Sequence, residues 1–274
     1  MRVVRILSAI LPLVLSVISC SVKEDRQFCP CLLTIDFTKA RDERYMPASA
    51  WDNGLIVEVF SMGQIICKEI YRLENVSNLE TLQVDRGDVT VVCIAGLDRA
   101  SMSMKDISTP SGNQSDHLYV FSEAVSCREE TAFVYADMYK QYTDVHVREA
   151  LNGPDQRISF DGFSLIARSR SNPLDIIFRK ASEGVFECEL DRQEDGYLGF
   201  SMPRQHDRSV TIEMYRPDGS RAGVIPLAQK MTEAGYDWDA ISLGDVYVTV
   251  DMAALRFYVS VEGWNDNIIG DISL

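Results

Sequence analysis

Apolar and polar residues alternate with a period of two along most of the chain. Residues 33–38 read LTIDFT, in which each apolar residue is followed by a polar one, and residues 55–60 and 89–94 repeat the alternation with a larger apolar share. Successive side chains of a strand point to opposite faces, so this pattern is typical of strands with one or both faces buried. Many short strands separated by turn residues predict an all-β protein made of antiparallel β-sandwiches.

Two pairs of alternating segments near the end of the chain predict β-hairpins. Residues 210–214 and 222–227 flank the sequence Arg-Pro-Asp-Gly at 216–219. Pro-Asp-Gly is a turn signal, because proline presets one backbone angle and glycine accepts a positive one. Residues 246–251 and 255–261 also alternate and form the second pair.

Helical signals are few. Residues 227–235 read LAQKMTEAG, a run of good helix formers that ends at a glycine suited to the position after a helix C-terminus. Residues 130–141 are the second candidate, although their apolar positions fit a strand equally well. We therefore expect one or two short helices in an otherwise all-β chain.

The first 20 residues have the pattern of a bacterial lipoprotein signal. Arg2 and Arg5 precede the apolar run 6–18, which spans roughly 20 Å as a helix and is too short for a hydrocarbon core of about 30 Å. The following Val-Ile-Ser-Cys resembles a lipobox, in which the cysteine is acylated and becomes the first residue of the mature protein. We expect Cys20 to carry the lipid, and two or three acyl chains give a long-lived anchor. An ordinary signal peptide with Cys20 placed by chance is the alternative.

The charge of the chain argues against nucleic acid as a partner. There are 27 lysines and arginines against 41 aspartates and glutamates, a formal net charge of −14. Removal of residues 1–19 takes away two arginines, which leaves −16. Such a chain without a basic run lacks the footprint that holds phosphate backbones. The charged residues after Cys20 predict a solvated tether, and Lys23-Glu24-Asp25 is equally similar to a tag that sends some lipoproteins to the outer face of the outer membrane.

Six cysteines remain besides Cys20, and their spacing does not decide whether they pair. An exported protein permits disulfides, and six cysteines allow fifteen pairings. Cys67, Cys93 and Cys188 lie in alternating segments and are expected to be buried thiols. Cys29-Pro30-Cys31 is predicted to open the first strand, at a sheet edge, because proline has no N–H to donate. The sixth cysteine is Cys127.

No catalytic or metal-binding pattern is present in the sequence. The phosphate-binding, dinucleotide-binding, zinc-protease and nucleophile-elbow motifs are all missing. His117, His146 and His206 are too scattered to predict a catalytic or ligating group. Residues 237–239, Asp-Trp-Asp, fit a solvated turn better than a sugar or cation site. We expect no enzyme activity, cofactor, metal or small-molecule substrate.

The domain organisation follows from the length and the alternating segments. A chain of 274 residues accommodates two modest domains, each with its own core. Residues 99–116 are polar and rich in turn formers, and we expect a long loop inside the first domain there. The predicted division is a signal peptide at 1–19, a lipidated tether at 20–28, an N-terminal β-sandwich domain at 29–140 and a C-terminal one at 141–274.

Both ends of the mature chain resemble one known family. Residues 20–37, CSVKEDRQFCPCLLTIDF, are similar to the mature start of the fimbrillin-A-associated anchor lipoproteins of type V fimbriae, and residues 243–250 and 255–264 are similar to that family's closing strands. The resemblance implies two tandem transthyretin-like β-sandwich domains attached to the outer membrane through Cys20. It also implies a basal anchor or minor subunit that contacts the structural subunits of a fimbrium by β-strand addition.

Two alternatives stay open at this stage. Residues 266–274 keep apolar residues at alternate positions, and they serve either as a strand donated to another subunit or as the closing strand of the second domain. The second alternative for the whole protein is a surface glycan-binding lipoprotein, in which Trp51, Trp238 and Trp264 stack on sugar rings. An exposed concave site around Trp238 would distinguish this reading.

Overall fold

The computed structural model describes residues 29–150, 160, 162–193, 197–251, 256–261 and 268–271. Within them the chain is all-β, with one short α-helix, α2 (Leu227–Glu233), and one 3₁₀ turn, η2 (Ala48–Trp51). The predicted fold class is therefore confirmed. The predicted signal peptide and the Cys20 tether lie outside the described residues.

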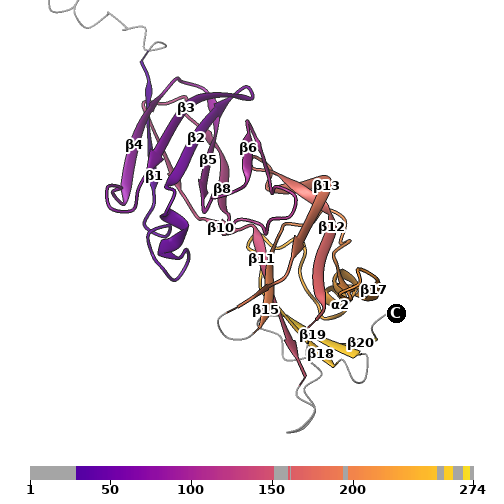
Figure 1. Ribbon diagram of the computed structural model, residues 1–274. Coiled ribbons are helices and arrows are strands. Elements are labelled where there is room, and N and C mark those ends of the chain that lie inside the picture. Colours follow the sequence, from indigo (N-terminus) through magenta and orange to yellow (C-terminus); the bar gives the residue numbers. More distant parts are fainter. Residues whose placement is uncertain are drawn as a thin grey trace, which may run out of the picture.

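The first half of the chain forms two sheets that face each other (Figure 1). Apolar side chains from both sheets pack between them in one core that includes Leu33, Val57 and Val91. The three-stranded sheet has the order β4 (Leu79–Val84), β1 (Cys31–Asp36), β9 (Thr131–Tyr135). The five-stranded sheet has the order β10 (Tyr139–Lys140), β8 (Tyr119–Ser126), β5 (Asp88–Ala95), β2 (Leu55–Ser61), β3 (Gln64–Tyr71).

The second half forms another pair of sheets around a separate core that includes Val147, Phe186 and Phe257. One sheet has the order β14 (Asp191–Arg192), β15 (Leu198–Pro203), β11 (Tyr142–Glu149), β18 (Val246–Asp251), β19 (Arg256–Val261), β20 (Ile268–Asp271). The other has the order β17 (Arg221–Ile225), β16 (Thr211–Tyr215), β12 (Ser164–Asp175), β7 (Asp106–Ser108), β6 (Ser101–Ser103), with β13 (Lys180–Glu189) also paired to β12.

The alternating pattern of the sequence accounts for these strands. In β1, Cys31, Leu33 and Ile35 are fully buried, whereas Leu32 between them is 42% exposed. Both predicted hairpins form, as β16–β17 and β18–β19. The predicted helix forms as α2, and Gly235 beyond its end has a φ of 82°, which glycine adopts without strain. The ambiguous segment 130–141 is extended, as β9 and β10.

Two expectations from the sequence are wrong. Residues 99–116 are not a plain loop, because they contain the hairpin β6–β7, which pairs with β12 of the second half. Ile107 anchors this hairpin with an exposed fraction of only 1%, and a few scattered apolar residues in a polar stretch are a weak sequence signal. β1 is not an edge strand, since it lies between β4 and β9. Pro30 precedes the strand, so its missing N–H interrupts no ladder bond.

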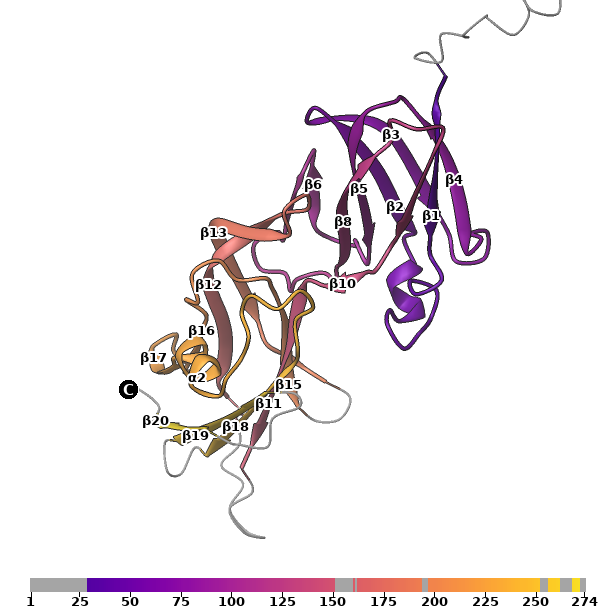
Figure 2. The same cartoon turned by 180° about the vertical axis from the view of Figure 1, so that it is seen from behind.

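A third apolar cluster joins the two halves. Phe60, Val92 and Val120 from the outer face of the five-stranded sheet pack with Ile107 and Leu174. Figure 2 shows β6 between the sheets of the first half and the β12–β13 region. The predicted domain division near residue 141 stays a prediction, and the β6–β7 hairpin shows that a segment early in the chain completes a sheet of the second half.

The closing strand of the chain is also placed. β20 pairs antiparallel with β19, with Ile269 opposite Tyr258. Residues 268–271 therefore close the last sheet in this chain, and the remainder of the C-terminal segment lies outside the described residues.

Candidate functional site

The predicted lipid attachment site, Cys20, lies outside the described residues and stays a prediction. In the part of the chain that the structure describes, no helix has both the length and the apolar character needed to cross a bilayer. Two other surfaces are candidates for function, an open sheet edge and a polar cavity between the two halves.

The open edge with the longest strand in the first half is β3, and other sheets also end in edge strands such as β4 and β9. Among the described residues β3 pairs with β2 alone, so its outer N–H and C=O groups are available to another strand. Its exposed side chains include Ile66 and Ile70, which are 41% and 60% exposed. A bulge opposite Val59 and Phe60 and the charge of Lys68 restrain unspecific pairing at this edge. Lys68 also forms an ion pair of 2.7 Å with Glu58, whose carboxylate is buried.

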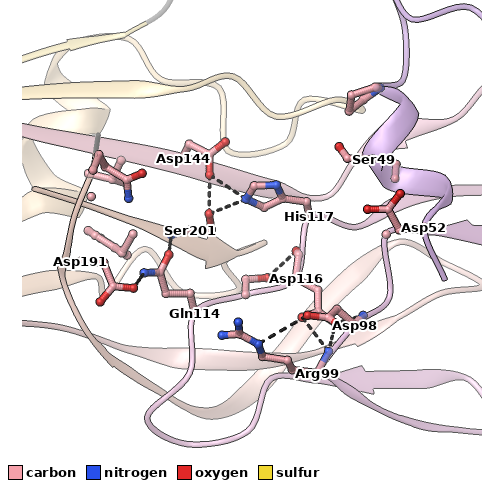
Figure 3. Close-up of a pocket in the computed structure, with 18 of the residues that line it drawn as sticks. Ser49, Asp52, Asp98, Arg99, Gln114, Asp116, His117, Asp144, Asp191 and Ser201 are labelled. Carbon is pink, nitrogen blue, oxygen red and sulfur yellow. Dashed lines mark hydrogen bonds and ion pairs between the residues drawn. The ribbon is translucent and has the colours of Figure 1, made fainter. Parts of the chain in front are cut away.

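The cavity has a volume of about 800 Å³ and lies between the η2 region of the first half and the outer face of the β11–β15 strand pair (Figure 3). The segment 114–117 forms part of its wall. Alternation in β11 explains why the side of this strand that faces the cavity is polar. Val145 and Val147 enter the core, so Asp144 and His146 point to the outer face of the sheet. The polar lining includes Asp52, Gln114, His117, Asp144, Asp191 and Ser201.

A hydrogen-bonded network of three side chains lies in this cavity. Figure 3 shows His117, Asp144 and Ser201 pointing toward one another. His117 Nε2 lies 2.9 Å from Ser201 Oγ and 3.4 Å from Asp144 Oδ1, and the Ser201 hydroxyl donates to the same Asp144 oxygen. The His117 ring stacks on Tyr142 with 4.4 Å between ring centroids. The network therefore fastens segment 114–117 to β11 and β15.

The same three residue types form catalytic triads, but their geometry here differs. In a triad, one ring nitrogen of histidine accepts the serine proton and the other donates to the carboxylate. Here Nε2 contacts both partners, and the Ser201 proton already goes to Asp144. His117 must then donate from Nε2, so it is not placed to act as a base toward Ser201. The arrangement is structural rather than nucleophilic.

The network also sets the charge state of Asp144. Burial by itself raises the pKa of this carboxyl group, but hydrogen bonds from His117 and Ser201 outweigh burial and lower the pKa to about 2. Lys140 adds to the lowering and lies 3.6 Å from Asp144 Oδ2. Asp144 is therefore ionised at neutral pH.

Further contacts hold the cavity wall in place. The backbone N–H groups of Asp98, Arg99 and Ala100 all donate to the Asp116 carboxylate, at 2.7–3.0 Å. Gln114 accepts from the Ser201 N–H at 3.0 Å and donates to Asp191 at 2.6 Å. A carboxylate that receives several backbone bonds organises a loop, so the wall is preformed.

The residues considered from sequence are distributed as follows. Trp238 is only 6% exposed, its indole N–H donates to Thr232 Oγ1 at 3.0 Å, and its ring packs edge-on against Tyr236. Trp238 and Asp239 do line a small cavity, but the buried indole offers little ring surface on which a sugar could stack. Trp51 is also buried, and Trp264 lies outside the described residues. His206 lies away from the other two histidines, in a second cavity of about 360 Å³.

The six described cysteines are all free thiols. Cys93 and Cys188 are buried as predicted, and burial raises the pKa of Cys188 to about 12. Cys67 is only half-buried, because it lies on the edge strand β3. Cys29 is exposed beside the buried Cys31. Among the described residues, no group of three or more His, Cys, Asp or Glu side chains is arranged to hold a metal ion.

Sequence reasoning missed the His117–Asp144–Ser201 network. The three residues come from three separate segments and share no motif, and their meeting depends on the pairing of β11 with β15. The only local signal was that Asp144 and His146 occupy the polar positions of an alternating strand, which places both on the outer face of the sheet.

The comparisons with known proteins rest on fold alone. No family model matches the chain, and no curated protein matches it in sequence. The fimbrial anchor protein Mfa2 from Porphyromonas gingivalis is similar in structure at 10% identity, with a TM-score of 0.59, over 86% of this chain and 98% of that one. A candidate polysaccharide-binding protein from Bacteroides thetaiotaomicron is similar at 15% identity, with a TM-score of 0.62, over 87% and 98%.

A candidate adhesin from Bacteroides ovatus is similar at 12% identity, with a TM-score of 0.62, over 90% of this chain and 97% of that one. This chain therefore has the same fold as a fimbrial anchor protein along nearly its full length. The likeness expected from the two ends of the sequence is confirmed at the level of fold.

Proposed function

We propose that this chain is a non-enzymatic outer-membrane lipoprotein that acts as an anchor or minor subunit of a fimbrium. Acylated Cys20 tethers it to the outer membrane, the charged residues up to 28 separate it from the bilayer, and the β-sandwich domains at 29–140 and 141–274 stand on the cell surface. Other fimbrial subunits join it by β-strand addition.

The observation that carries this proposal is the fold shared with the anchor Mfa2 over 98% of that protein. The lipoprotein signal at residues 1–20 supports the proposal independently of the fold, because it is inferred from the sequence alone. A folded domain held by acyl chains at its N-terminus retains all its sheet edges for partners. That geometry suits the membrane end of a polymer.

The open edge of β3 supports strand addition. A strand added at an edge gains main-chain hydrogen bonds, and its side chains set the register. The C-terminal residues 268–271 are already paired with β19 in this chain, which favours a closing-strand role for them over donation to a neighbour. β3 is therefore the proposed acceptor edge.

The experiment compares wild type, Cys20→Ala and Cys29→Ala in the native host. Cys29 is the matched control, because it is an exposed cysteine outside the lipobox. Metabolic labelling with an alkyne fatty acid reports acylation, and electron microscopy with fractionation reports whether fimbriae are on cells or in the medium. Protease treatment of intact cells reports surface exposure.

We expect Cys20→Ala alone to lose the fatty-acid label and to release fimbriae into the medium or leave them abnormally long. Cys29→Ala should resemble wild type in both assays. The proposal fails if Cys20→Ala keeps the label, or if the fimbriae are unchanged and the wild-type protein never copurifies with them.

A further inference from the structure

Two cysteines of the first half come from opposite sheets of the same sandwich. Cys31 is the first residue of β1, in the three-stranded sheet, and Cys127 directly follows β8, in the five-stranded sheet. Both belong to the core between these sheets, and both are fully shielded from solvent. A bond between their side chains would therefore join one sheet to the other.

The short connection between β4 and β5 holds the two cysteines near each other. Val84, the last residue of β4, lies opposite Cys31 in the strand register. Gly87, just before β5, exchanges two backbone hydrogen bonds with Cys127, at 2.7 and 3.3 Å. Residues that exchange both bonds lie about 5.5 Å apart between their Cα atoms. Cys31 and Cys127 are therefore fixed to the two ends of segment 84–87.

Arg86 within this segment fastens the chain on both sides. Its Nε donates to the carbonyl oxygen of Cys29 at 2.9 Å, and its Nη1 donates to the carbonyl oxygen of Arg128 at 3.5 Å. The N–H groups of a guanidinium form a rigid planar fork, so the two carbonyl groups are held at a fixed spacing. The Leu32 N–H donates to the Glu130 carbonyl oxygen at 2.8 Å and adds a direct bond between the same two segments.

The two thiol groups contact each other inside this frame. Burial raises the pKa of Cys127, and the charge and hydrogen bond of the neighbouring Cys31 thiol raise it further. A disulfide requires two cysteines whose backbones lie close together and whose side chains point toward each other. The hydrogen-bonded backbone segments provide the first condition, and the contact between the thiols provides the second.

The other described cysteines are placed differently. Cys29 is exposed, Cys67 lies on the edge strand β3, and Cys188 belongs to the core of the second half. Cys93 on β5 shares the core of the first half, but burial is the only cause that raises the pKa of its thiol. Cys31 and Cys127 are therefore the pair that the structure favours.

We propose that Cys31 and Cys127 form a disulfide that joins the two sheets of the first half in the exported protein. Two S–H bonds break and one S–S bond forms. The two protons and two electrons pass to the disulfide of an exported thiol oxidoreductase, which becomes a dithiol. The reacting species is a thiolate, and burial raises the pKa of Cys127, so the bond forms while the chain folds and before the two side chains are buried.

This proposal rests on the proposed function only through export, because disulfides form and persist in oxidising compartments. In an anchor held at Cys20, a pull on the fimbrium enters the fold at β1, the first strand after the tether. The disulfide transmits this pull from β1 to the end of β8 in the opposite sheet through a covalent bond.

The test maps the cysteines of the full-length lipoprotein from the native host. Cells are lysed in denaturant with N-ethylmaleimide, which blocks free thiols, and the purified protein is digested with trypsin without a reducing agent. Trypsin cleaves after lysine and arginine, so Cys29 and Cys31 share the peptide 27–39 and Cys127 lies on the peptide 106–128. Fragmentation between Cys29 and Cys31 in a mass spectrometer identifies which of them carries the link.

We expect the peptides 27–39 and 106–128 to be linked through Cys31, and Cys93 to carry N-ethylmaleimide. The pairing is overturned if the link starts from Cys29, or if no link forms even when the protein is refolded from urea in a glutathione redox buffer. A link that forms only on such refolding overturns the disulfide in the native host, and protease treatment of intact cells then shows whether export has failed as well.

Thermal unfolding with and without dithiothreitol gives an independent measurement. Dithiothreitol should lower the melting temperature of wild type by roughly 5–15 °C, the shift expected for a disulfide that closes a long loop. Cys31→Ser and Cys127→Ser should show no such shift. Cys93→Ser is the matched control, because Cys93 is equally buried in this core, and it should shift as wild type does. No shift in wild type, or an equal shift in Cys31→Ser, would overturn the proposal.

Discussion

Asp144 is the residue on which the polar network between the two halves depends. It accepts the Ser201 hydroxyl, lies 3.4 Å from His117 Nε2 and 3.6 Å from Lys140 Nζ, and its own N–H donates to Asp245. Its neighbours Val145 and Val147 belong to the core of the second half. A single carboxylate therefore ties the cavity wall to the strand that begins the second pair of sheets.

We predict that Asp144 makes the protein sensitive to acid. Its pKa is about 2 in the folded protein against an ordinary value of 3.8, so the ionised form stabilises the fold. A lowered carboxyl pKa gives stability that is fully present above about pH 4 and is lost as pH falls from about 4 to about 2. The shift corresponds to about 2 kcal/mol. Urea unfolding at pH 7 and pH 3 measures it.

In this experiment Asp144→Asn should lower the free energy of unfolding at pH 7 by about 2 kcal/mol and reduce the loss between pH 7 and pH 3. Asp191→Asn, an exposed carboxylate in the same cavity, is the control and should retain the wild-type pH dependence. Equal pH dependence in wild type and Asp144→Asn would show that the network does not stabilise the ionised carboxylate.

At the scale of elements, the β6–β7 hairpin holds the two halves together. Ile107 is 1% exposed and packs with residues of the five-stranded sheet and of β12. We predict that Ile107→Ala lowers the free energy of unfolding by about 2–5 kcal/mol, the usual cost of a buried isoleucine cavity. Met104→Ala in the same hairpin turn is the control, because Met104 is 62% exposed, and it should change stability by less than about 0.5 kcal/mol.

Chemical denaturation of both variants measures the difference. A small effect of Ile107→Ala would mean that the third apolar cluster adds little stability and that polar contacts such as the His117–Asp144–Ser201 network hold the halves together. A second transition seen only in Ile107→Ala would show that the hairpin couples the unfolding of the two halves.

The elements that follow from the sequence are those whose signals are local. The alternation in β1, the Pro-Asp-Gly turn before β17 and the helix formers of α2 each specify structure within a few residues. Ile107 shows why the β6–β7 hairpin could not be found in this way, because its partners lie on β12, far along the chain. His117 and Ser201 meet only through strand pairing, so no spacing rule reveals them.

At the scale of the whole molecule, exposed apolar residues mark surfaces that can bind a partner, whereas buried ones belong to the cores. The two sandwich cores and the junction cluster bury the apolar faces of the sheets, and Trp51 and Trp238 are among the buried residues. β3 keeps exposed isoleucines on a strand with one free edge, and β9 likewise keeps exposed Phe133 and Tyr135 on a strand that pairs with β1 alone among the described residues. An edge of that kind is costly in an isolated protein and useful in one that joins other subunits.

The β3 edge gives the last prediction. A strand added beside β3 would place side chains next to Ile70, so a lysine there puts a charge against the incoming strand without disturbing the core. We expect Ile70→Lys to keep the wild-type melting temperature and lipid anchoring, but to reduce copurification with fimbrial subunits severalfold, measured by pull-down from detergent-solubilised cells. Ile241→Lys is the matched control, because Ile241 is 57% exposed and lies outside the strands. Loss of copurification in both variants would point to a general charge effect, and loss in neither would remove β3 as the joining edge, because an added strand must lie beside Ile70.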